Sequence, residues 1–126
     1  MTTKDHTLNW FEISVLDIER AKKFYETIFD IQMRQEEMMD MVTIYFPMNE
    51  GSGKVSGALV KSPMHKPSAD GVKIYLNANP DLATVLAKIE PAGGQITVPK
   101  TPIAKYGFMA FFTDTEGNLL ALHSNH

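Results

Sequence analysis

Apolar and polar positions alternate along residues 9–17, NWFEISVLD, and this period of two predicts a β-strand. One face of the strand is apolar and consists of Phe11, Ile13 and Val15. The opposite face carries Trp10, Glu12 and Ser14. A carboxylate next to a tryptophan in mid-strand suits neither open solvent nor a dry core. The surface that this face meets therefore has to come from elsewhere in the chain.

The hydrophobic period changes from two to about 3.6 after Asp17, which predicts a helix of about three turns. Asp17 is placed to cap the first turn, and Glu19 adds negative charge there. The apolar stripe of this helix consists of Ala21, Phe24, Tyr25 and Ile28. Strands are predicted beyond it at about 32–38, 42–46 and 55–60, with a turn near Asp40 and a loop over 47–54.

The second half of the chain repeats the first. Ile13 corresponds to Ile74 and Ala21 to Leu82, a shift of 61 positions in both elements. Asn79 and Pro80 are predicted to be the cap and first residue of a second helix, which Gly93-Gly94 ends. Its apolar stripe consists of Leu82, Val85, Leu86 and Ile89. A strand at 72–76 precedes the helix, and strands at about 95–98, 107–113 and 119–124 follow it, with a loop at 99–102 and a turn at 114–118.

The element order is therefore βαβββ twice, an α+β chain that contains an internal duplication. We predict a single domain over residues 1–126, with one module at about 7–62 and the other at about 70–126. Two half-sheets of this kind bury their helices on one side, and pairing them leaves a curved surface whose concave side is a cleft. Trp10, Glu12 and Ser14 lie on the side away from the helix, so they are predicted to line this cleft.

Amino-acid composition argues against several classes of function. The chain has 126 residues and a net charge of −3, so nothing in its charge indicates a nucleic-acid partner. It has no cysteine, which excludes disulfides and thiolate chemistry. The first ten residues lack the apolar segment of a signal peptide, and no apolar run approaches the ~20 residues that span a membrane. A soluble, cytoplasmic protein without a membrane partner is expected.

Three segments resemble the vicinal oxygen chelate superfamily, the group of glyoxalases, bleomycin-resistance proteins and dioxygenases. They are residues 9–30, which contain D-x-x-R-A-x-x-F-Y-x-x-x-F, residues 56–63, SGALVKSP, and residues 93–124, which contain the D-x-E-G-N turn. The two motifs together are specific, whereas either alone is weak. The resemblance implies two βαβββ modules paired into a cup-shaped, partly open barrel. Because members are commonly dimers, it also implies a homodimer.

The resemblance implies four metal-ligand positions in the cup, and this chain departs from all of them. Trp10 occupies the position seven residues before Asp17, and its equivalent in the second module falls near Lys73. Ala121 occupies the last-strand position, and residues 55–59 offer only Val, Ser, Gly, Ala and Leu. None of these side chains binds a divalent cation well. We therefore predict no metal and no cofactor.

Several side chains are candidates for ligand contact. Glu12 is either a ligand-contacting carboxylate or general base, or half of a structural ion pair with Lys73. Trp10 and Tyr75 either form an aromatic wall of the cup or pack in the core. His123 lies two residues after Ala121 and therefore on the same face of the predicted strand. It either faces the rim of the cup or is exposed to solvent.

The predicted function is small-molecule binding in the concave cup without a metal. The predicted contacts are Trp10, Glu12, Lys73, Tyr75 and His123. No catalytic residue can be assigned, although Glu12 is the best candidate, and the spacing of residues supports no Ser-His-Asp arrangement. The alternatives are a metal-dependent lyase, isomerase or dioxygenase of the same superfamily, and an interaction module whose cup binds nothing.

Overall fold

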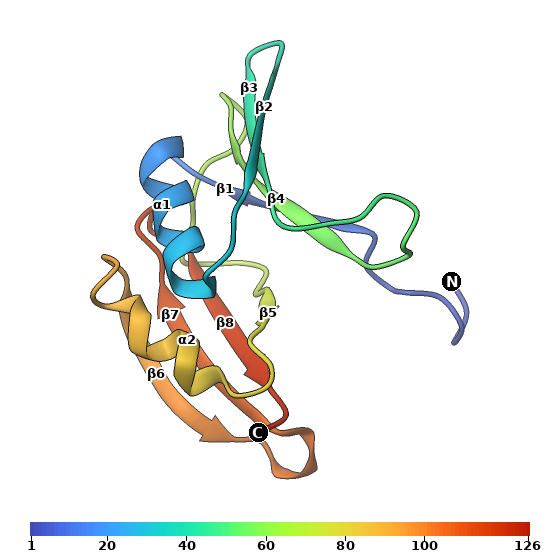
Figure 1. The fold of residues 1–126 in the computed structure, drawn as a ribbon, viewed down its shortest axis with the longest axis vertical. Helices are drawn as coiled ribbons and strands as arrows, with labels where there is room; N and C mark the ends of the chain where they lie inside the picture. Colours follow the sequence, from blue (N-terminus) through green and yellow to red (C-terminus); the bar gives the residue numbers. More distant parts are fainter.

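A computed structural model describes residues 1–126, and it contains two modules of the predicted βαβββ order (Figure 1). The first module consists of β1 (Trp10–Ser14), α1 (Ile18–Phe29), β2 (Arg34–Met38), β3 (Met41–Tyr45) and β4 (Ser56–Lys61). The second consists of β5 (Tyr75–Asn77), α2 (Leu82–Ile89), β6 (Gln95–Pro102), the short 3-10 helix η1 (Ala104–Tyr106), β7 (Phe108–Thr113) and β8 (Leu119–Ser124). The predicted duplication is confirmed.

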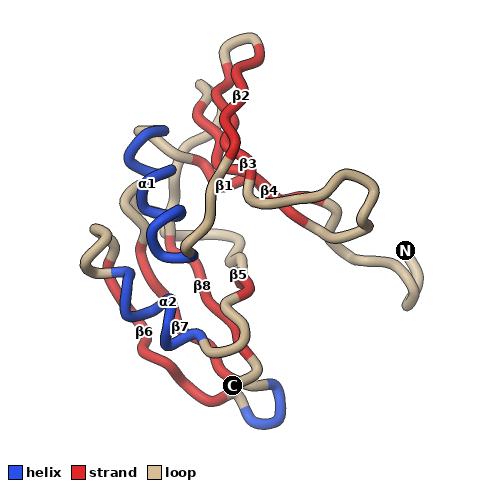
Figure 2. Tube along the Cα trace, in the orientation of Figure 1, coloured by secondary structure: helices blue, strands red, loops and turns tan.

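Each module forms its own four-stranded sheet, and the two strand orders correspond: β1-β4-β3-β2 and β5-β8-β7-β6. β1 runs parallel to β4 and β5 runs parallel to β8, while the other pairs are antiparallel. No backbone ladder joins the sheets, so they stay unclosed, and β1 and β5 are edge strands (Figure 2). No helix of the protein has both the length and the apolar character that crossing a bilayer requires.

The first helix forms as its sequence predicts. The Asp17 side chain accepts a hydrogen bond from the Arg20 N–H at 3.0 Å, and Asp30 ends the helix in the left-handed conformation. The predicted apolar stripe is fully buried and consists of Ala21, Phe24, Tyr25 and Ile28. These side chains and those of α2 share one core, in which the rings of Phe24 and Phe112 lie 6.1 Å apart.

The prediction for the start of the second helix is wrong. Asp81 is the cap, because its carboxylate accepts a hydrogen bond from the Ala83 N–H at 2.9 Å. Asn79 instead belongs to the preceding loop, where its side chain bonds to Asn77 and accepts from the Asn125 N–H. Aspartate is a preferred capping residue, and Asp81 directly precedes Leu82, the first residue of the helix.

Two strand boundaries in the second module also differ from the predictions. β5 is three residues long and begins at Tyr75, so Lys73 precedes it and Val72 is 89% exposed. β6 continues to Pro102, so the predicted loop at 99–102 is the end of a strand. The pairing of β6 with β7 shifts register between Ile96 and Val98 and again between Val98 and Thr101, and the second shift accommodates Pro99, which cannot donate a ladder hydrogen bond.

The turn between β7 and β8 fastens the two modules together. Glu116 Oε1 accepts hydrogen bonds from the N–H groups of Leu16 and Asp17 at 2.8 and 2.7 Å, and its Oε2 accepts one from Arg20 Nε at 2.7 Å. Nearby, the hydroxyl of Tyr25 donates to Asp114 at 2.7 Å. These residues form the clamp: Leu16, Asp17, Arg20, Tyr25, Asp114, Glu116 and Asn118. The two family-like motifs in the sequence are therefore the two halves of one contact.

The clamp changes the acidity of its members. Burial alone would raise the pKa of the Glu116 carboxyl, but hydrogen bonds from Arg20, from backbone N–H groups and from Thr115 outweigh it and lower the pKa to about 2. Burial, followed by the neighbouring charge of Asp114, raises the pKa of the Tyr25 phenol well above its usual value. Both shifts favour a carboxylate that stays ionised and a phenol that stays protonated.

Candidate functional site

The face of the first sheet that points away from α1 carries the predicted strand residues. Ile13 and Val15 are buried in the core, so Trp10, Glu12 and Ser14 lie on the opposite side of β1. We call this side of each sheet the helix-free face. It extends across the sheet, since Glu12 lies opposite Ala58 and Ala58 lies opposite Tyr45.

Aromatic and charged groups stack along this face of the first sheet. The rings of Trp10 and Tyr45 lie 6.0 Å apart, and the guanidinium of Arg34 lies 4.6 Å above the centre of the Tyr45 ring. Trp10 remains 36% exposed. The face therefore offers an aromatic surface that solvent and solutes can reach.

Glu12 pairs with a histidine and not with the predicted lysine. Its Oε1 lies 2.8 Å from His65 Nε2, whereas the Lys73 ammonium donates to the carbonyl groups of Ala69 and Gly71 at 3.0 and 3.3 Å. The prediction of a Glu12–Lys73 ion pair is wrong. Its basis was the internal repeat, and the repeat fails at this point because β5 begins only after Lys73.

The helix-free face of the second sheet carries the other candidates. Tyr75 lies opposite Ala121, and Ala121 lies opposite Phe111, so the three share this face. The rings of Tyr75 and Phe111 are 5.8 Å apart, and Tyr75 is 53% exposed. His123 follows on the same face, where its Nε2 lies 2.7 Å from the carbonyl oxygen of Tyr106.

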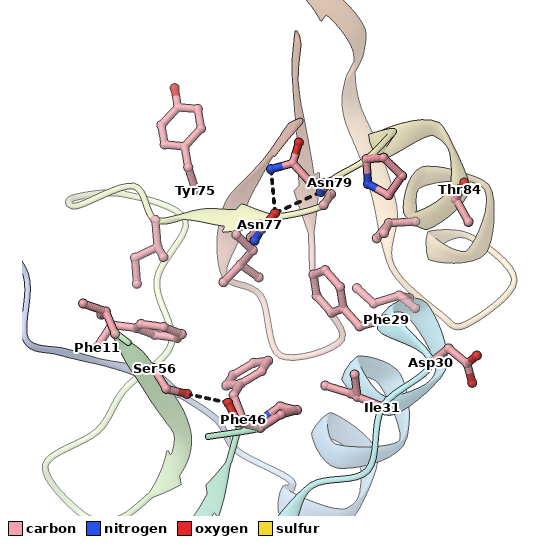
Figure 3. A pocket seen from close by; sticks show the side chains of 18 of the residues that line it. Phe11, Phe29, Asp30, Ile31, Phe46, Ser56, Tyr75, Asn77, Asn79 and Thr84 are labelled. Atoms are coloured by element: carbon pink, nitrogen blue, oxygen red, sulfur yellow. Dashed lines mark hydrogen bonds between the residues drawn. The ribbon is translucent and has the colours of Figure 1, made fainter. Parts of the chain in front are cut away.

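A cavity of about 700 Å³ lies elsewhere, between the two modules (Figure 3). Phe11 of β1, Phe29 at the end of α1 and Phe46 after β3 form part of its wall, and 12 of its 21 lining residues are hydrophobic. Phe11 points to the side of β1 opposite Trp10, so at β1 the cavity lies away from the helix-free face, and it extends to Ser56, which lies opposite Trp10. Of the five predicted contacts only Tyr75 borders it, and Figure 3 shows the Tyr75 ring turned away from the other labelled side chains.

The polar part of the cavity comes from the segment between β5 and α2. Asn77 Oδ1 accepts hydrogen bonds from the N–H and the Nδ2 of Asn79, both at 2.9 Å, which leaves Asn77 Nδ2 without an acceptor. Thr84 on α2 borders the same space (Figure 3). Hydrophobic side chains with a few convergent polar groups are typical of sites for small molecules.

Two of these features could not be predicted from the sequence. His65 lies in the loop between the modules, and nothing in its spacing links it to Glu12, 53 positions away. The three phenylalanines of the cavity have the signature of core residues, and only the arrangement of the modules leaves space between them. The only indication in the sequence was that Phe11 lies on the apolar face of its strand. This pattern predicts that Phe11 is buried, but it does not predict a cavity.

Comparison with known families decides the classification of this chain. The model of the Glyoxalase/Bleomycin resistance protein/Dioxygenase superfamily matches residues 7–122. The chain belongs to this superfamily. Its membership confirms the resemblance seen in the sequence motifs.

Two sequence relatives and two solved structures are similar to this chain. The chain is 29% identical over 119 residues to "Putative glyoxylase CFP32" of Mycobacterium bovis and of Mycobacterium tuberculosis, and the match covers 92% of this chain but 44% of theirs. This chain thus spans about half the length of these curated relatives. Among solved structures, glyoxalase I of Zea mays (a V278E mutant) has a TM-score of 0.70 at 18% identity, over 94% of this chain and 46% of that one. The hypothetical protein SA1046 of S. aureus has a TM-score of 0.66 at 20% identity, over 95% of both chains.

The residues at the superfamily's metal-ligand positions do not fit a metal ion. Trp10 and Ala121 face the helix-free side, where the ligands would be needed, but neither side chain has a donor atom for a divalent cation. The nearby Glu12 and His65 bond to each other and form only a pair. No group of three or more His, Asp or Glu side chains in this superfamily member could hold a metal ion.

Proposed function

We propose that this protein is a member of the superfamily that binds a small molecule and works without a metal ion. The observation that carries the proposal is the cavity of about 700 Å³ between the modules. Ligand pockets in proteins have volumes of roughly 300–1,000 Å³ and are lined mainly by hydrophobic and aromatic side chains. The cavity meets both conditions.

The lining favours one class of ligand. Phe11, Phe29 and Phe46 offer ring faces and edges to an aromatic or aliphatic body. The Nδ2 of Asn77 donates to no protein group, so its two N–H groups can bond to an acceptor on the ligand. A compact apolar molecule that carries a carbonyl, ether or similar acceptor matches this arrangement.

The helix-free faces are the second candidate position for a ligand. Trp10 with Tyr45, and Tyr75 with Phe111, form two aromatic pairs there, and Glu12, His65 and His123 supply polar groups. The sequence prediction assigned these faces to one concave cup, with Trp10, Glu12, Tyr75 and His123 among its contacts. Lys73 is the weakest of the predicted contacts, because its ammonium already bonds to two carbonyl groups.

A metal-dependent lyase, isomerase or dioxygenase is the alternative function, and the names of the relatives favour it. The side chains of this chain oppose it, because a zinc or iron site requires at least three protein ligands of suitable chemistry. Metal content therefore separates the two functions directly.

One experiment tests the proposal in two steps. Metal analysis of protein purified without chelators is expected to find far less than one metal per chain, and added Zn²⁺, Ni²⁺, Mn²⁺ or Fe²⁺ is expected to leave the melting temperature unchanged. A set of small aromatic ketones, ethers and phenols is then screened by melting temperature, and binders are expected to raise it by several degrees when they exceed their Kd about 100-fold.

Matched variants show where a binder resides. Thr84→Trp fills the cavity and is expected to abolish the rise in melting temperature, whereas Ala83→Trp places the same side chain one residue away, outside the cavity lining. Glu12→Gln changes only the helix-free face. Loss of binding in Glu12→Gln but not in Thr84→Trp would move the site to the cup, and one tightly held metal per chain would overturn the metal-independent function.

We also propose that the protein is a homodimer. β1 and β5 are edge strands with unpaired backbone groups, and each carries an exposed aromatic residue, Trp10 and Tyr75. Pairing with a second chain would cover these edges and bring helix-free faces of two chains together. Light scattering is expected to give about 28 kDa, twice the chain mass of 14.1 kDa. A mass of one chain at micromolar concentration would exclude the dimer.

A further inference from the structure

Three side chains on the helix-free face of the first module form a continuous hydrogen-bonded chain. Glu12 Oε1 lies 2.8 Å from His65 Nε2, and His65 Nδ1 lies 2.7 Å from Ser62 Oγ. Glu12 belongs to β1, whereas Ser62 and His65 belong to the loop that follows β4. The order carboxylate, imidazole, hydroxyl is the one that activates a serine in nucleophilic catalysis.

For an ionised Glu12 and a neutral His65, the two hydrogen bonds assign the positions of the protons. An ionised carboxylate can only accept, so the Nε2 of His65 must carry the hydrogen that points to Glu12. In a neutral imidazole the other nitrogen, Nδ1, is then an acceptor, and the hydroxyl of Ser62 must donate to it. Ser62 Oγ also accepts a hydrogen bond from the Met64 N–H at 3.1 Å, which holds the oxygen in place.

We propose that Ser62 is the nucleophile of an acyl-transfer site, with His65 as its general base and Glu12 as the positioning residue that orients His65. Ser62 Oγ attacks the carbonyl carbon of an ester while its proton moves to His65 Nδ1. The C–O bond to the leaving alcohol breaks, and His65 returns the proton to that alcohol. Water then hydrolyses the acyl-serine by the same route, releasing a carboxylic acid and restoring the hydroxyl.

The surroundings keep the three groups accessible and in order. The side chains of His65 and Glu12 are 20% and 38% exposed, so a substrate can reach them. The loop is fastened beyond the site, because the Ser68 N–H donates to Asn118 Oδ1 at 3.0 Å. Ordered groups lose little entropy when they react, which is a condition for an efficient proton relay.

The neighbouring side chains indicate the substrate class. Trp10 lies two residues from Glu12 on the same face and stacks near Tyr45. Trp10 lies opposite Ser56 and Glu12 lies opposite Ala58, whereas Ser62 follows the far end of β4, so the apolar surface of Trp10 lies on the side of Glu12 away from Ser62. Esters whose aromatic ring is separated by several bonds from the reacting carbonyl, and so reaches Trp10 past Glu12, are therefore the favoured substrates. This activity goes beyond the proposed binding function and does not depend on the cavity between the modules.

A fluorophosphonate probe and p-nitrophenyl acetate test the site in the 126-residue chain. The probe should label one residue, identified as Ser62 by peptide mass mapping, and the ester should be hydrolysed. Ser62→Ala is expected to lose both. His65→Gln should slow labelling and hydrolysis about 100-fold, since general-base catalysis contributes roughly 10²–10⁴ in rate. Glu12→Gln should slow both about tenfold while the melting temperature stays within a few degrees of the unsubstituted protein.

Two controls separate catalysis from structure. Ser68→Ala removes a hydroxyl from the same loop that donates to the Asp70 carbonyl and has no imidazole beside it, so labelling should not change. Added imidazole should restore part of the rate in His65→Gly, which a merely structural histidine would not allow. Labelling at another residue, or equal rates in Ser62→Ala, His65→Gln and Ser68→Ala, would overturn the proposal. The Glu12–His65 contact would then serve only to fasten the loop to β1.

Discussion

Replacing Glu116 by glutamine is expected to lower the free energy of unfolding by about 3 kcal/mol, because the backbone N–H groups and the half-exposed Arg20 that bond to this buried carboxylate lose a charged acceptor. The Glu116 side chain is fully buried and receives hydrogen bonds from Arg20 and from the N–H groups of Leu16 and Asp17. A neutral amide presents one acceptor oxygen in place of two and adds two donors. Urea unfolding at pH 7, followed by circular dichroism, measures the loss.

The same substitution should make stability less dependent on pH. The folded pKa of Glu116 is about 2, below its ordinary value of 4.5. A lowered folded pKa contributes stability above pH 4.5, and this contribution disappears as the pH falls from 4.5 towards 2. The difference between the original protein and Glu116→Gln should therefore be full at pH 7 and shrink steadily below pH 4.5.

Glu19→Gln is the matched control for this prediction. Glu19 lies in the exposed first turn of α1 and accepts no side-chain hydrogen bond, so its loss should cost less than about 1 kcal/mol. If Glu116→Gln and Glu19→Gln destabilise the protein equally, or if the Glu116→Gln difference is as large at pH 2.5 as at pH 7, the clamp does not stabilise the fold as described.

The clamp also shows what the sequence could and could not predict. The two motifs that contain Asp17, Arg20 and Glu116 were recognisable, and both helical stripes were found because a period of 3.6 is a local property. The bonds between the motifs join residues about 100 positions apart, so no local pattern predicts them. The motifs identified the superfamily, but their physical role became clear only when the modules were placed together.

The wrong prediction for the partner of Glu12 also arose because local patterns do not predict contacts between distant residues. The repeat mapped Glu12 onto Lys73, but pairing depends on where β5 begins, and a three-residue edge strand has almost no periodic signal. Conversely, the parity of β1 correctly placed Trp10 and Glu12 on the side away from α1, since alternation along a strand needs no tertiary information. The partner of Glu12 came from a loop, and loops carry functional groups to places that periodicity does not describe.

The position of β1 depends on one small residue of β4. Gly57 pairs with Phe11, and a side-chain carbon added at Gly57 would collide with the Phe11 carbonyl oxygen and lie 2.6 Å from two atoms of its ring. The carbonyl is part of the backbone and cannot turn aside, so β1 must move. Gly57→Ala is expected to lower the free energy of unfolding by about 2–3 kcal/mol, as overpacking does in cores.

Displacement of β1 should change two measurable properties, the fluorescence of Trp10 and the labelling of Ser62. Trp10 is the only tryptophan of the chain and lies on β1, so its fluorescence reports on the position of this strand. Gly57→Ala should shift the emission maximum and weaken the Glu12–His65 contact, which would reduce labelling of Ser62 in the folded fraction. Ser56→Ala is the control, because it changes the neighbouring residue of β4 and removes only an exposed 3.2 Å hydrogen bond. Unchanged stability and emission in Gly57→Ala would mean that β1 tolerates the added carbon and that the close approach of the two strands does not set the geometry of the site.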